Sequence, residues 1–313
     1  MKDFKVSVII PVYNAAQYVR KAVESAVFLD DVGEVILIED GSPDNAREVC
    51  EQLKKEYAKV SYFRHPGEQN KGAGESRNLG IRNAKNEYIA FLDADDWFLP
   101  NRFLKDKKVF KDFNIDGVYN ASSYSIDSEY AHNQIKNRYK TDDPENYLYT
   151  VREEIDQEDL FYYLLNGGRG HFHTTAITLR KRVFEKVGYF SDLKLHQDNH
   201  MFLRVASKCI LKAGEINKPT SRIRVHIDNR IKNVNKESRV LYYTSLYKDV
   251  FKELKQDRDK TTLIKKLISA KTLHIKSKPN RLLAIVYFSV QHFIKNPGDM
   301  GSFKLKYFLN SKV

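Results

Sequence analysis

Short apolar runs alternate with amphipathic stretches over the first 92 residues of the chain. The apolar runs predict four strands, at Val6–Pro11, Glu34–Glu39, Val60–Arg64 and Tyr88–Leu92. Apolar positions at helical spacing predict helices at about residues 15–28, 44–57 and 73–84. Because strands and helices alternate, the sequence predicts an α/β fold with a mostly parallel central sheet.

Polar residues follow the first two predicted strands and are expected to gather at one edge of the sheet. Tyr13 and Asn14 follow the first strand, and Asp40-Gly41-Ser42 follows the second. The carboxyl ends of parallel strands share an edge, and open α/β sheets bind their ligands there. Since Gly41 permits a tight turn, Asp40 is expected to face the ligand cleft, while Asp44 can cap the next helix.

Three carboxylates lie within four residues directly after the fourth predicted strand, in Asp93-Ala94-Asp95-Asp96. Crowded carboxylates repel one another unless a proton or a cation lies among them. Mg²⁺ and Mn²⁺ prefer a few carboxylates together with phosphate oxygens. The cluster therefore predicts a divalent cation that holds a nucleotide diphosphate. The alternative is an acidic turn that caps a helix after Pro100.

Four motifs, in this order and spacing, resemble the nucleotide-binding half of a family 2 glycosyltransferase with the GT-A fold. They are Ser7-Val8-Ile9-Ile10-Pro11-Val12-Tyr13-Asn14, Asp40-Gly41-Ser42, Asn70-x-Gly72…Arg77-Asn78-x-Gly80 and Asp93-Ala94-Asp95-Asp96. The resemblance covers about residues 4–230. It implies a Rossmann-like, mostly parallel central sheet flanked by helices. It also implies inverting sugar transfer from a nucleotide sugar, of the bacterial type that builds surface polysaccharides or glycolipids.

The resemblance implies roles for the residues on the nucleotide side. Pro11 and Tyr13 belong to the matched segment that binds the nucleotide sugar. Asp40 matches the carboxylate that accepts a hydrogen bond from uracil N3–H, so a UDP-sugar is the expected donor. Arg77 matches the basic residue that reaches the base or the diphosphate, and its permanent charge suits either partner. The family more often has two Asp before the glycine, so Glu39 leaves any second base contact open.

The resemblance also implies roles in the acidic cluster. Asp93 matches the carboxylate that contacts the ribose or the sugar, and Asp95 matches the metal ligand. Asp96 positions the donor or caps the next turn. His226 matches a late position at which a histidine contacts the metal or the diphosphate. The implied cofactor is Mn²⁺ or Mg²⁺, and the implied activity is a metal-dependent hexosyl- or N-acetylhexosaminyltransferase.

A second stretch of the family carries the catalytic base, and it is similar to Val183–Asp192, His196-Gln197-Asp198-Asn199 and Arg204 of this chain. Asp198 falls at the position of the base, whereas Gln197 replaces the acidic residue that usually precedes it. A general base must be ionised and within hydrogen-bond reach of the acceptor hydroxyl. Loss of the neighbouring charge favours the ionised form of Asp198. The alternative is that Asp198 caps a helix at residues 199–208.

The glycine-rich segment Gly167–His173 is expected to approach the acceptor cleft. His171 and His173 have strand-like spacing, only one of them is expected to face inward, and His173 is a candidate for positioning the acceptor or donor. A metal site formed by these histidines with the aspartates is the alternative, although the ligand spacing typical of zinc is absent. Ser123–Thr150 is polar and tyrosine-rich without a clear period, and is expected to be an acceptor-side insertion.

Most of the positive charge lies near the carboxyl end. Residues 241–313 contain 15 Lys and Arg against 5 Asp and Glu, or +10 of the total net charge of +12. Helices are expected near residues 240–256, 261–276 and 280–295, and the apolar run Leu282–Val290 is too short to span a bilayer. Two interpretations stay open: an amphipathic element on an anionic membrane, or a helical appendage packed on the catalytic domain or on a second subunit.

The predicted organisation is therefore a nucleotide-sugar-binding half at residues 1–115, an acceptor-binding half at 116–239 and a basic helical region at 240–313. The run Val6–Val12 is a strand and not a signal peptide, and Cys50 and Cys209 form no ligand motif. These features favour a cytoplasmic protein, with attachment to the inner face of the cell membrane as an open option.

The expected partners are a UDP-sugar donor and a glycan or lipid-linked saccharide acceptor, with oligomerisation left open. The alternatives to transferase activity are a non-catalytic binder of sugar nucleotides and, with less support, a basic nucleic-acid-binding protein. Nucleic acid is not expected, because the acidic cluster would repel a polyanion.

Overall fold

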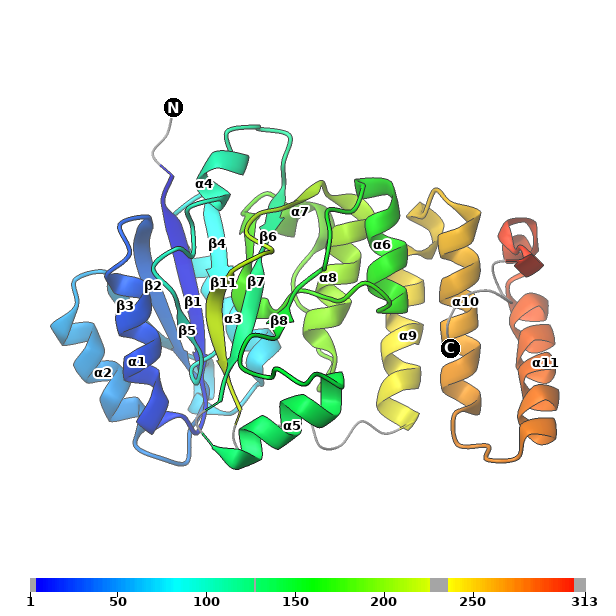
Figure 1. Cartoon of the computed structure of the whole chain (residues 1–313), viewed down its shortest axis with the longest axis horizontal. Helices are drawn as coiled ribbons and strands as arrows, with labels where there is room; N and C mark the ends of the chain where they lie inside the picture. Colours follow the sequence, from blue (N-terminus) through cyan, green and yellow to red (C-terminus); the bar gives the residue numbers. More distant parts are fainter. Residues whose placement is uncertain (1–3, 127, 226–235, 307–313) are drawn as a thin grey trace. The chain divides into compact units, whose positions relative to one another are not determined.

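The computed structural model describes residues 4–126, 128–225 and 236–306 (Figure 1). The chain divides into two compact units. Unit 1 contains Met1–Ile155, Arg169–Asp192 and Cys209–Asn229, and unit 2 contains Asp156–Gly168, Leu193–Lys208 and Arg230–Val313. The predicted boundaries at residues 115 and 239 stay a prediction. Unit 2 includes two segments, Asp156–Gly168 and Leu193–Lys208, that lie within the predicted acceptor-binding half at residues 116–239.

A seven-stranded sheet forms the centre of unit 1, in the order β10-β6-β9-β4-β1-β2-β3. Its strands are β1 (Val6–Val12), β2 (Val32–Glu39), β3 (Val60–Arg64), β4 (Tyr88–Phe91), β6 (Gly117–Tyr119), β9 (Ile177–Arg180) and β10 (Leu211–Ala213). The first four run parallel, whereas β9 runs antiparallel to both β4 and β6. The predicted α/β fold with a mostly parallel sheet is confirmed.

A smaller sheet of four strands has the order β5-β11-β7-β8. It contains β5 (Trp97–Phe98), β7 (Ala121–Ser125), β8 (Leu148–Tyr149) and β11 (Pro219–Arg224). Since β5 follows Asp93-Ala94-Asp95-Asp96 directly, this smaller sheet begins beside the acidic cluster.

The helices of unit 1 are α1 (Ala16–Val27), α2 (Ala46–Glu56), α3 (Ala73–Asn83), α4 (Asp106–Val109), α5 (Glu129–Tyr139) and α7 (Val183–Val187), with short 3₁₀ helices η1 (Pro66–Glu68) and η2 (Thr174–Ala176). The three predicted amino-terminal helices agree with α1, α2 and α3. The helix expected after Pro100 is only the single turn α4, and the stretch expected to lack a period contains α5. Residues 171–173 form a loop that leads into η2 and not a strand, and the side chains of His171 and His173 are both half-buried.

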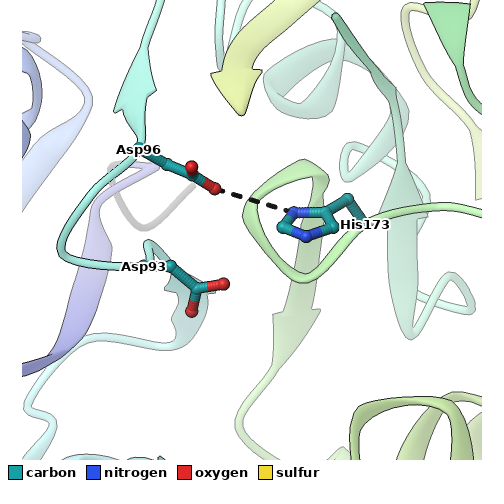
Figure 2. Close-up of side chains that lie close together, drawn as sticks. All are labelled: Asp93, Asp96 and His173. Atoms are coloured by element: carbon teal, nitrogen blue, oxygen red, sulfur yellow. Dashed lines mark ion pairs between the residues drawn. The ribbon is translucent and has the colours of Figure 1, made fainter. Parts of the chain in front are cut away.

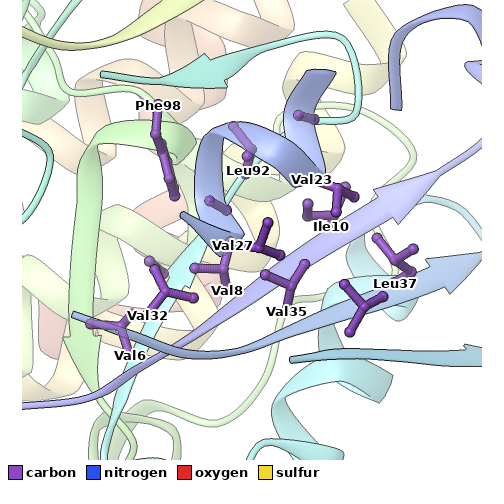
Figure 3. Packing of buried hydrophobic residues seen from close by; sticks show 14 of the residues in the cluster. Val6, Val8, Ile10, Val23, Val27, Val32, Val35, Leu37, Leu92 and Phe98 are labelled. Atoms are coloured by element: carbon purple, nitrogen blue, oxygen red, sulfur yellow. The ribbon is translucent and has the colours of Figure 1, made fainter. Parts of the chain in front are cut away.

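Alternate residues of β1 form the core on one face of the large sheet. Val6, Val8 and Ile10 pack with Val23 and Val27 of α1 in one buried cluster (Figure 3). Side chains alternate along a strand and recur every three or four residues along a helix, so an apolar stripe of α1 covers one face of the sheet.

One carboxylate connects the starts of α1 and α2. Asp44 Oδ2 accepts a hydrogen bond from the N–H of Ala16 at 2.9 Å, and Oδ1 accepts one from the N–H of Ala46 at 3.2 Å. The predicted capping role of Asp44 is confirmed, and it extends to a second helix. Both helix starts are thereby fixed at the carboxyl edge of the sheet.

α3 covers the opposite face of the sheet at close range. Gly80 of α3 lies against Ile9 of β1, and a Cβ at this position would clash with Cγ2 of Ile9 and lie 3.0 Å from its Cγ1. The close approach therefore requires a glycine in the helix interior, although glycine is a poor helix former.

Unit 2 is helical. It contains α6 (Gln157–Asn166), α8 (Gln197–Lys208), α9 (Lys236–Val250), α10 (Asp257–Thr272) and α11 (Lys278–Lys295), with 3₁₀ helices η4 (Phe251–Glu253) and η5 (Pro297–Ser302). α9, α10 and α11 lie side by side (Figure 1). The three predicted carboxyl-terminal helices are present with shifted bounds. None of the helices in the described ranges has the length and apolar character needed to cross a membrane.

Replacing Gly80 by alanine is expected to lower the free energy of unfolding by about 1–3 kcal/mol, the usual cost of overpacking. In an exposed helix, replacing glycine by alanine raises the free energy of unfolding by up to about 1 kcal/mol. A decrease in the free energy of unfolding for Gly80→Ala would therefore support the close packing on Ile9. Gly168→Ala is the matched control, because nothing lies within 4 Å of its added Cβ. Urea unfolding measures both variants, and an unchanged midpoint for Gly80→Ala would contradict the packing argument.

Candidate active site

The strands β1, β2 and β4 end at the same edge of the large sheet because they run parallel and in register. Val12 of β1 lies opposite Glu39 of β2, and Ile9 lies opposite Phe91 of β4. Pro11 lies inside β1, and Tyr13 directly after it is exposed. The loops at this edge carry the residues predicted to bind the nucleotide sugar.

Asp40 follows β2 and holds the loop that leads into α3. Its Oδ1 accepts a hydrogen bond from the N–H of Lys71 at 2.7 Å, and its Oδ2 accepts one from the N–H of Gly72 at 2.9 Å. His65 Nε2 lies 3.5 Å from Oδ1. Asp40 is therefore buried, and its role in ordering the start of α3 was not predicted from the sequence. Each carboxylate oxygen keeps a second lone pair, which is the capacity that a contact with uracil N3–H requires.

The turn after Asp40 is fixed by its neighbours. Gly41 has φ +69°, and a Cβ there would lie 2.9 Å from the carbonyl oxygen of Glu68. Glu39 accepts hydrogen bonds from the N–H of Ser42 and, at 2.8 Å, from Nε of Arg64. The buried Glu39 carboxylate thus supports the turn, which accounts for a longer acidic side chain at this position.

Arg77 connects α3 to the acidic cluster. Its Nη2 donates to Asp93 Oδ1 at 2.7 Å, and its guanidinium carbon lies 5.5 Å from the centre of the Phe190 ring. Asn78 bonds both the N–H and the carbonyl oxygen of Phe190, at 2.9 and 3.0 Å. Because Arg77 is buried on α3, its charge is held in one place beside Asp93.

Arg224, the last residue of β11, fixes the acidic loop from the smaller sheet. Its backbone N–H donates to Asp96 Oδ1 at 2.9 Å, and its Nε donates to the carbonyl oxygen of Asp95 at 3.2 Å. Its guanidinium carbon lies 4.9 Å from the ring centre of Tyr18 and 5.2 Å from that of Trp97. The Arg224 guanidinium thus lies against the aromatic rings of Tyr18 and Trp97 beside the acidic loop.

Asp93, Asp96 and His173 come together at this edge. Figure 2 shows the side chains of Asp96 and His173 pointing toward one another, with Asp93 nearby. Asp96 Oδ2 and His173 Nδ1 are 3.9 Å apart, and one ligand atom from each of the three residues lies within 4.8 Å of the others. Asp95, the predicted metal ligand, is close in sequence but is not a member of this group.

His173 is held at the start of η2 by its local turn. Its Nδ1 lies 2.9 Å from Thr175 Oγ1 and accepts from the N–H of Thr175 at 3.4 Å. Thr175 Oγ1 is in turn 3.2 Å from Ser221 Oγ of β11. The sequence indicated His173 as a positioning residue, but its place beside Asp96 depends on contacts between segments far apart in the chain.

Burial raises the pKa of Asp96 well above its ordinary value, and the charges of Asp95 and Asp93 raise it further. Asp96 Oδ2 is enclosed and has no hydrogen-bond donor among the described residues. A buried carboxylate oxygen without a donor is costly, and a cation removes that cost. Two carboxylates and an imidazole are also ordinary ligands for Mn²⁺, so the residues present fit a divalent ion.

Asp198, the predicted base, lies in unit 2. It is half-buried in the first turn of α8, and its Oδ1 accepts from the N–H of Asn199 at 2.8 Å. Since α8 begins at Gln197, Asp198 lies one residue inside the helix and does not precede it. Burial lowers the pKa of the adjacent His196, which the Asp198 charge partly offsets. His226, the other predicted metal contact, lies outside the described residues.

Residues 7–188, more than half of the chain, match the family model described as glycosyl transferase family 2. The chain belongs to glycosyl transferase family 2. This family membership confirms the resemblance that the four sequence motifs indicated.

Known glycosyltransferases are similar to this family 2 chain in sequence. An uncharacterized glycosyltransferase of Rickettsia bellii is 28% identical over 249 residues, which are 79% of this chain and 33% of that protein. Glycosyltransferase GlyG of Streptococcus pneumoniae is 28% identical over 220 residues, 66% of this chain and 67% of that protein. The chain spans about a third of the length of the first of these curated relatives.

Solved structures share the fold of this family 2 chain. S. aureus TarS in complex with UDP-GlcNAc matches with a TM-score of 0.63 at 18% identity, over 90% of this chain and 79% of that one. The mannosyltransferase PcManGT from Pyrobaculum calidifontis, solved with GDP-Man and Mn²⁺, matches with a TM-score of 0.51 at 14% identity, over 97% and 84%. These likenesses confirm the predicted GT-A fold with a helical carboxyl-terminal region.

In the presence of a chelator, Asp96→Asn is expected to raise the melting temperature at about pH 8 by a few degrees. The pKa of Asp96 is raised in the folded chain, so its ionisation destabilises the fold. This loss of stability is absent below the ordinary aspartate pKa of about 3.9, and it grows as the pH rises through the raised pKa of Asp96 in the folded chain. Asparagine carries no such cost and can still accept the hydrogen bond from the Arg224 N–H.

The gain from Asp96→Asn should therefore shrink as the solution is acidified. Asp142→Asn is the matched control, because Asp142 is exposed in the same unit, and its effect should stay near zero at every pH. Melting curves in a series of buffers measure both variants. A pH-independent effect of Asp96→Asn would contradict the raised pKa.

Proposed function

We propose that this chain is an inverting glycosyltransferase that moves a sugar from a UDP-sugar to a hydroxyl group of a glycan or lipid-linked saccharide. The observation that carries the proposal is the group formed by Asp93, Asp96 and His173, with Arg77 bonded to Asp93, at the carboxyl edge of the sheet. Carboxylates and a fixed guanidinium at one point suit an anionic diphosphate that arrives with a divalent cation.

The proposed donor site uses the loops after β1, β2 and β4. Asp40 accepts the uracil N3–H with its remaining lone pairs, and Pro11 and Tyr13 border the base. Asp93 contacts the ribose or the sugar, and Arg77 neutralises part of the diphosphate charge. TarS, which shares the fold, was solved with UDP-GlcNAc, and this supports a hexosyl or N-acetylhexosaminyl donor.

The residues proposed to hold the divalent ion are Asp93, Asp96 and His173, together with Asp95 and His226, which the family pattern implies. A bound Mn²⁺ or Mg²⁺ would supply Lewis-acid stabilisation of the leaving diphosphate. A Mn²⁺ ion accompanies GDP-Man in the solved PcManGT structure, which supports the choice of metal class.

Asp198 is proposed to take the proton from the acceptor hydroxyl as its oxygen attacks the anomeric carbon. Attack from the face opposite the diphosphate inverts the configuration at that carbon. The polysaccharide or glycolipid acceptor and a cytoplasmic setting on the inner face of the membrane belong to the same proposal.

One observation favours a second candidate function. Gln197 stands where the family usually has an acidic residue, and a chain with a weakened base could bind a sugar nucleotide without transferring the sugar. A measurement of sugar transfer distinguishes a non-catalytic binder of sugar nucleotides from a transferase.

A panel of nucleotide sugars with and without Mn²⁺ tests the donor. A UDP-sugar at about 100 times its dissociation constant should stabilise the chain by about 2.7 kcal/mol, whereas GDP-mannose should give no shift. Asp95→Asn and Asp96→Asn should each lose the part of the shift that depends on Mn²⁺, with Asp142→Asn as the control. Stabilisation by no UDP-sugar in the panel, together with no release of UDP, would overturn the proposed function.

Asp198→Asn is expected to lower turnover about 10²- to 10⁴-fold with little change in UDP-sugar binding. Asparagine nearly preserves the shape of the side chain and can still accept the hydrogen bond from the Asn199 N–H. Asp192→Asn is the matched control, because Asp192 is an exposed aspartate a few residues away. UDP release measures turnover, and thermal shift measures binding. Full activity of Asp198→Asn would remove this residue from the chemistry.

A further inference from the structure

The outer face of α11 is apolar along its whole length. Its exposed side chains are Leu282, Leu283, Val286, Tyr287, Val290 and Ile294, and each is between 52 and 74% exposed. They recur at spacings of one, three and four residues, so they form a continuous stripe on one side of the helix. An apolar stripe of this size on a water-exposed helix marks an interaction surface.

The opposite side of α11 is fixed to the rest of unit 2, so the outer face has a defined orientation. His292 is buried, and its Nε2 lies 2.8 Å from Asp299 Oδ2 in η5. Tyr247 of α9 donates its hydroxyl hydrogen to the same carboxylate oxygen. α11 also packs along α10. The exposed apolar stripe is therefore on the side of α11 that stays exposed when the other side packs against the rest of unit 2.

Positive charges flank the stripe at both ends. Lys276 precedes α11, Lys295 is its last residue, and Lys304 and Lys306 follow η5; all four are exposed. Residues 260–313 contain 11 Lys and Arg and one acidic residue, Asp299, which is buried and bonded to His292 and Tyr247. Asp257 offsets part of the charge of Lys304, from 3.4 Å, and the surroundings of the stripe still have an excess of positive charge.

We propose that the outer face of α11, with the lysines at its ends, binds the surface of an anionic lipid bilayer. The apolar side chains enter the boundary between headgroups and acyl chains, and Tyr287 lies at the depth that aromatic side chains prefer. The flanking lysines keep their ammonium groups in the headgroup layer, where anionic lipids attract them. The helix lies on the membrane and does not cross it.

Charge decides between a bilayer and a second copy of the chain. A symmetric dimer through this face would place the same surface of both copies together, so the flanking lysines of one copy would meet lysines of the other. Asp257 is paired with Lys304, and residues 260–306 supply no exposed side-chain carboxylate to balance the other lysines. An anionic bilayer supplies the missing negative charge and covers the apolar side chains at the same time.

Co-sedimentation of the full chain with vesicles tests the proposal independently of any transferase activity. The chain should bind vesicles of phosphatidylglycerol and phosphatidylcholine in low salt, and it should bind phosphatidylcholine alone weakly. Raised salt should weaken the binding because it screens the lysines. Replacing Lys276 and Lys295 by glutamine should lower the partition coefficient about fivefold per lysine.

The apolar stripe is tested with a matched pair of double variants. Leu283→Glu with Ile294→Glu should lower the partition coefficient at least about tenfold. Leu104→Glu with Leu241→Glu changes two exposed leucines elsewhere and should bind as the unchanged chain does. Because all four positions are exposed, neither double variant should alter the melting temperature or the far-ultraviolet circular dichroism.

Two results would overturn the proposal. One is an intact chain that stays in the supernatant with anionic vesicles in low salt. The other is equal loss of binding in the two double variants, which would assign the binding to charge alone. Light scattering without lipid adds a third measurement, of the oligomeric state. If the chain does not bind vesicles but forms a dimer, and Leu283→Glu with Ile294→Glu dissociates that dimer, the outer face of α11 binds a second copy of the chain instead of a membrane.

Discussion

A fully buried ion pair between Arg102 and Asp106 holds the two sheets of unit 1 together, with Nη1 and Oδ2 3.0 Å apart. Arg102 also donates to backbone carbonyl groups of η2 and β9. Asp106 accepts from Thr178 of β9 and from Asn120 between β6 and β7, and Asn120 accepts from the N–H of Glu215 between β10 and β11. Removing one partner of such a pair costs about 3–5 kcal/mol. The pair therefore fixes η2, and with it the loop that carries His173.

This scaffold allows the site to contain a group that is unfavourable for folding. Asp96 is enclosed, its pKa is raised, and its Oδ2 has no hydrogen-bond donor in the described part of the chain. A flexible loop would turn such a carboxylate toward water. Here the Arg224 N–H holds one oxygen from β11, and the strands on both sides are fixed by the buried network. The rigidity of the surroundings thus keeps the Asp96 carboxylate away from solvent, which agrees with its proposed role in holding a cation.

The elements that depend on local pattern were predicted well from the sequence, whereas those that depend on distant contacts were not. β1 to β4 and α1 to α3 follow from apolar periodicity, and the acidic cluster follows from its place after β4. The antiparallel strand β9 enters the sheet between β4 and β6, and no local signal marks that pairing. The strand-like spacing of His171 and His173 likewise did not predict the loop that residues 171–173 form. The role of Asp40 in ordering the start of α3 was not predicted, because its bonds to Lys71 and Gly72 come from 31 and 32 residues away.

The distribution of charge around the site supports the proposed divalent cation independently of the family resemblance. Asp40, Asp93, Asp95 and Asp96 lie at or just after the carboxyl ends of two strands, and Arg77 already pairs with Asp93. An anionic diphosphate would therefore meet net negative charge at this edge, although the whole chain carries +12. A divalent cation that travels with the donor would change the sign of this interaction, so the charge at this edge supports the proposal of a metal-bound diphosphate over a free one.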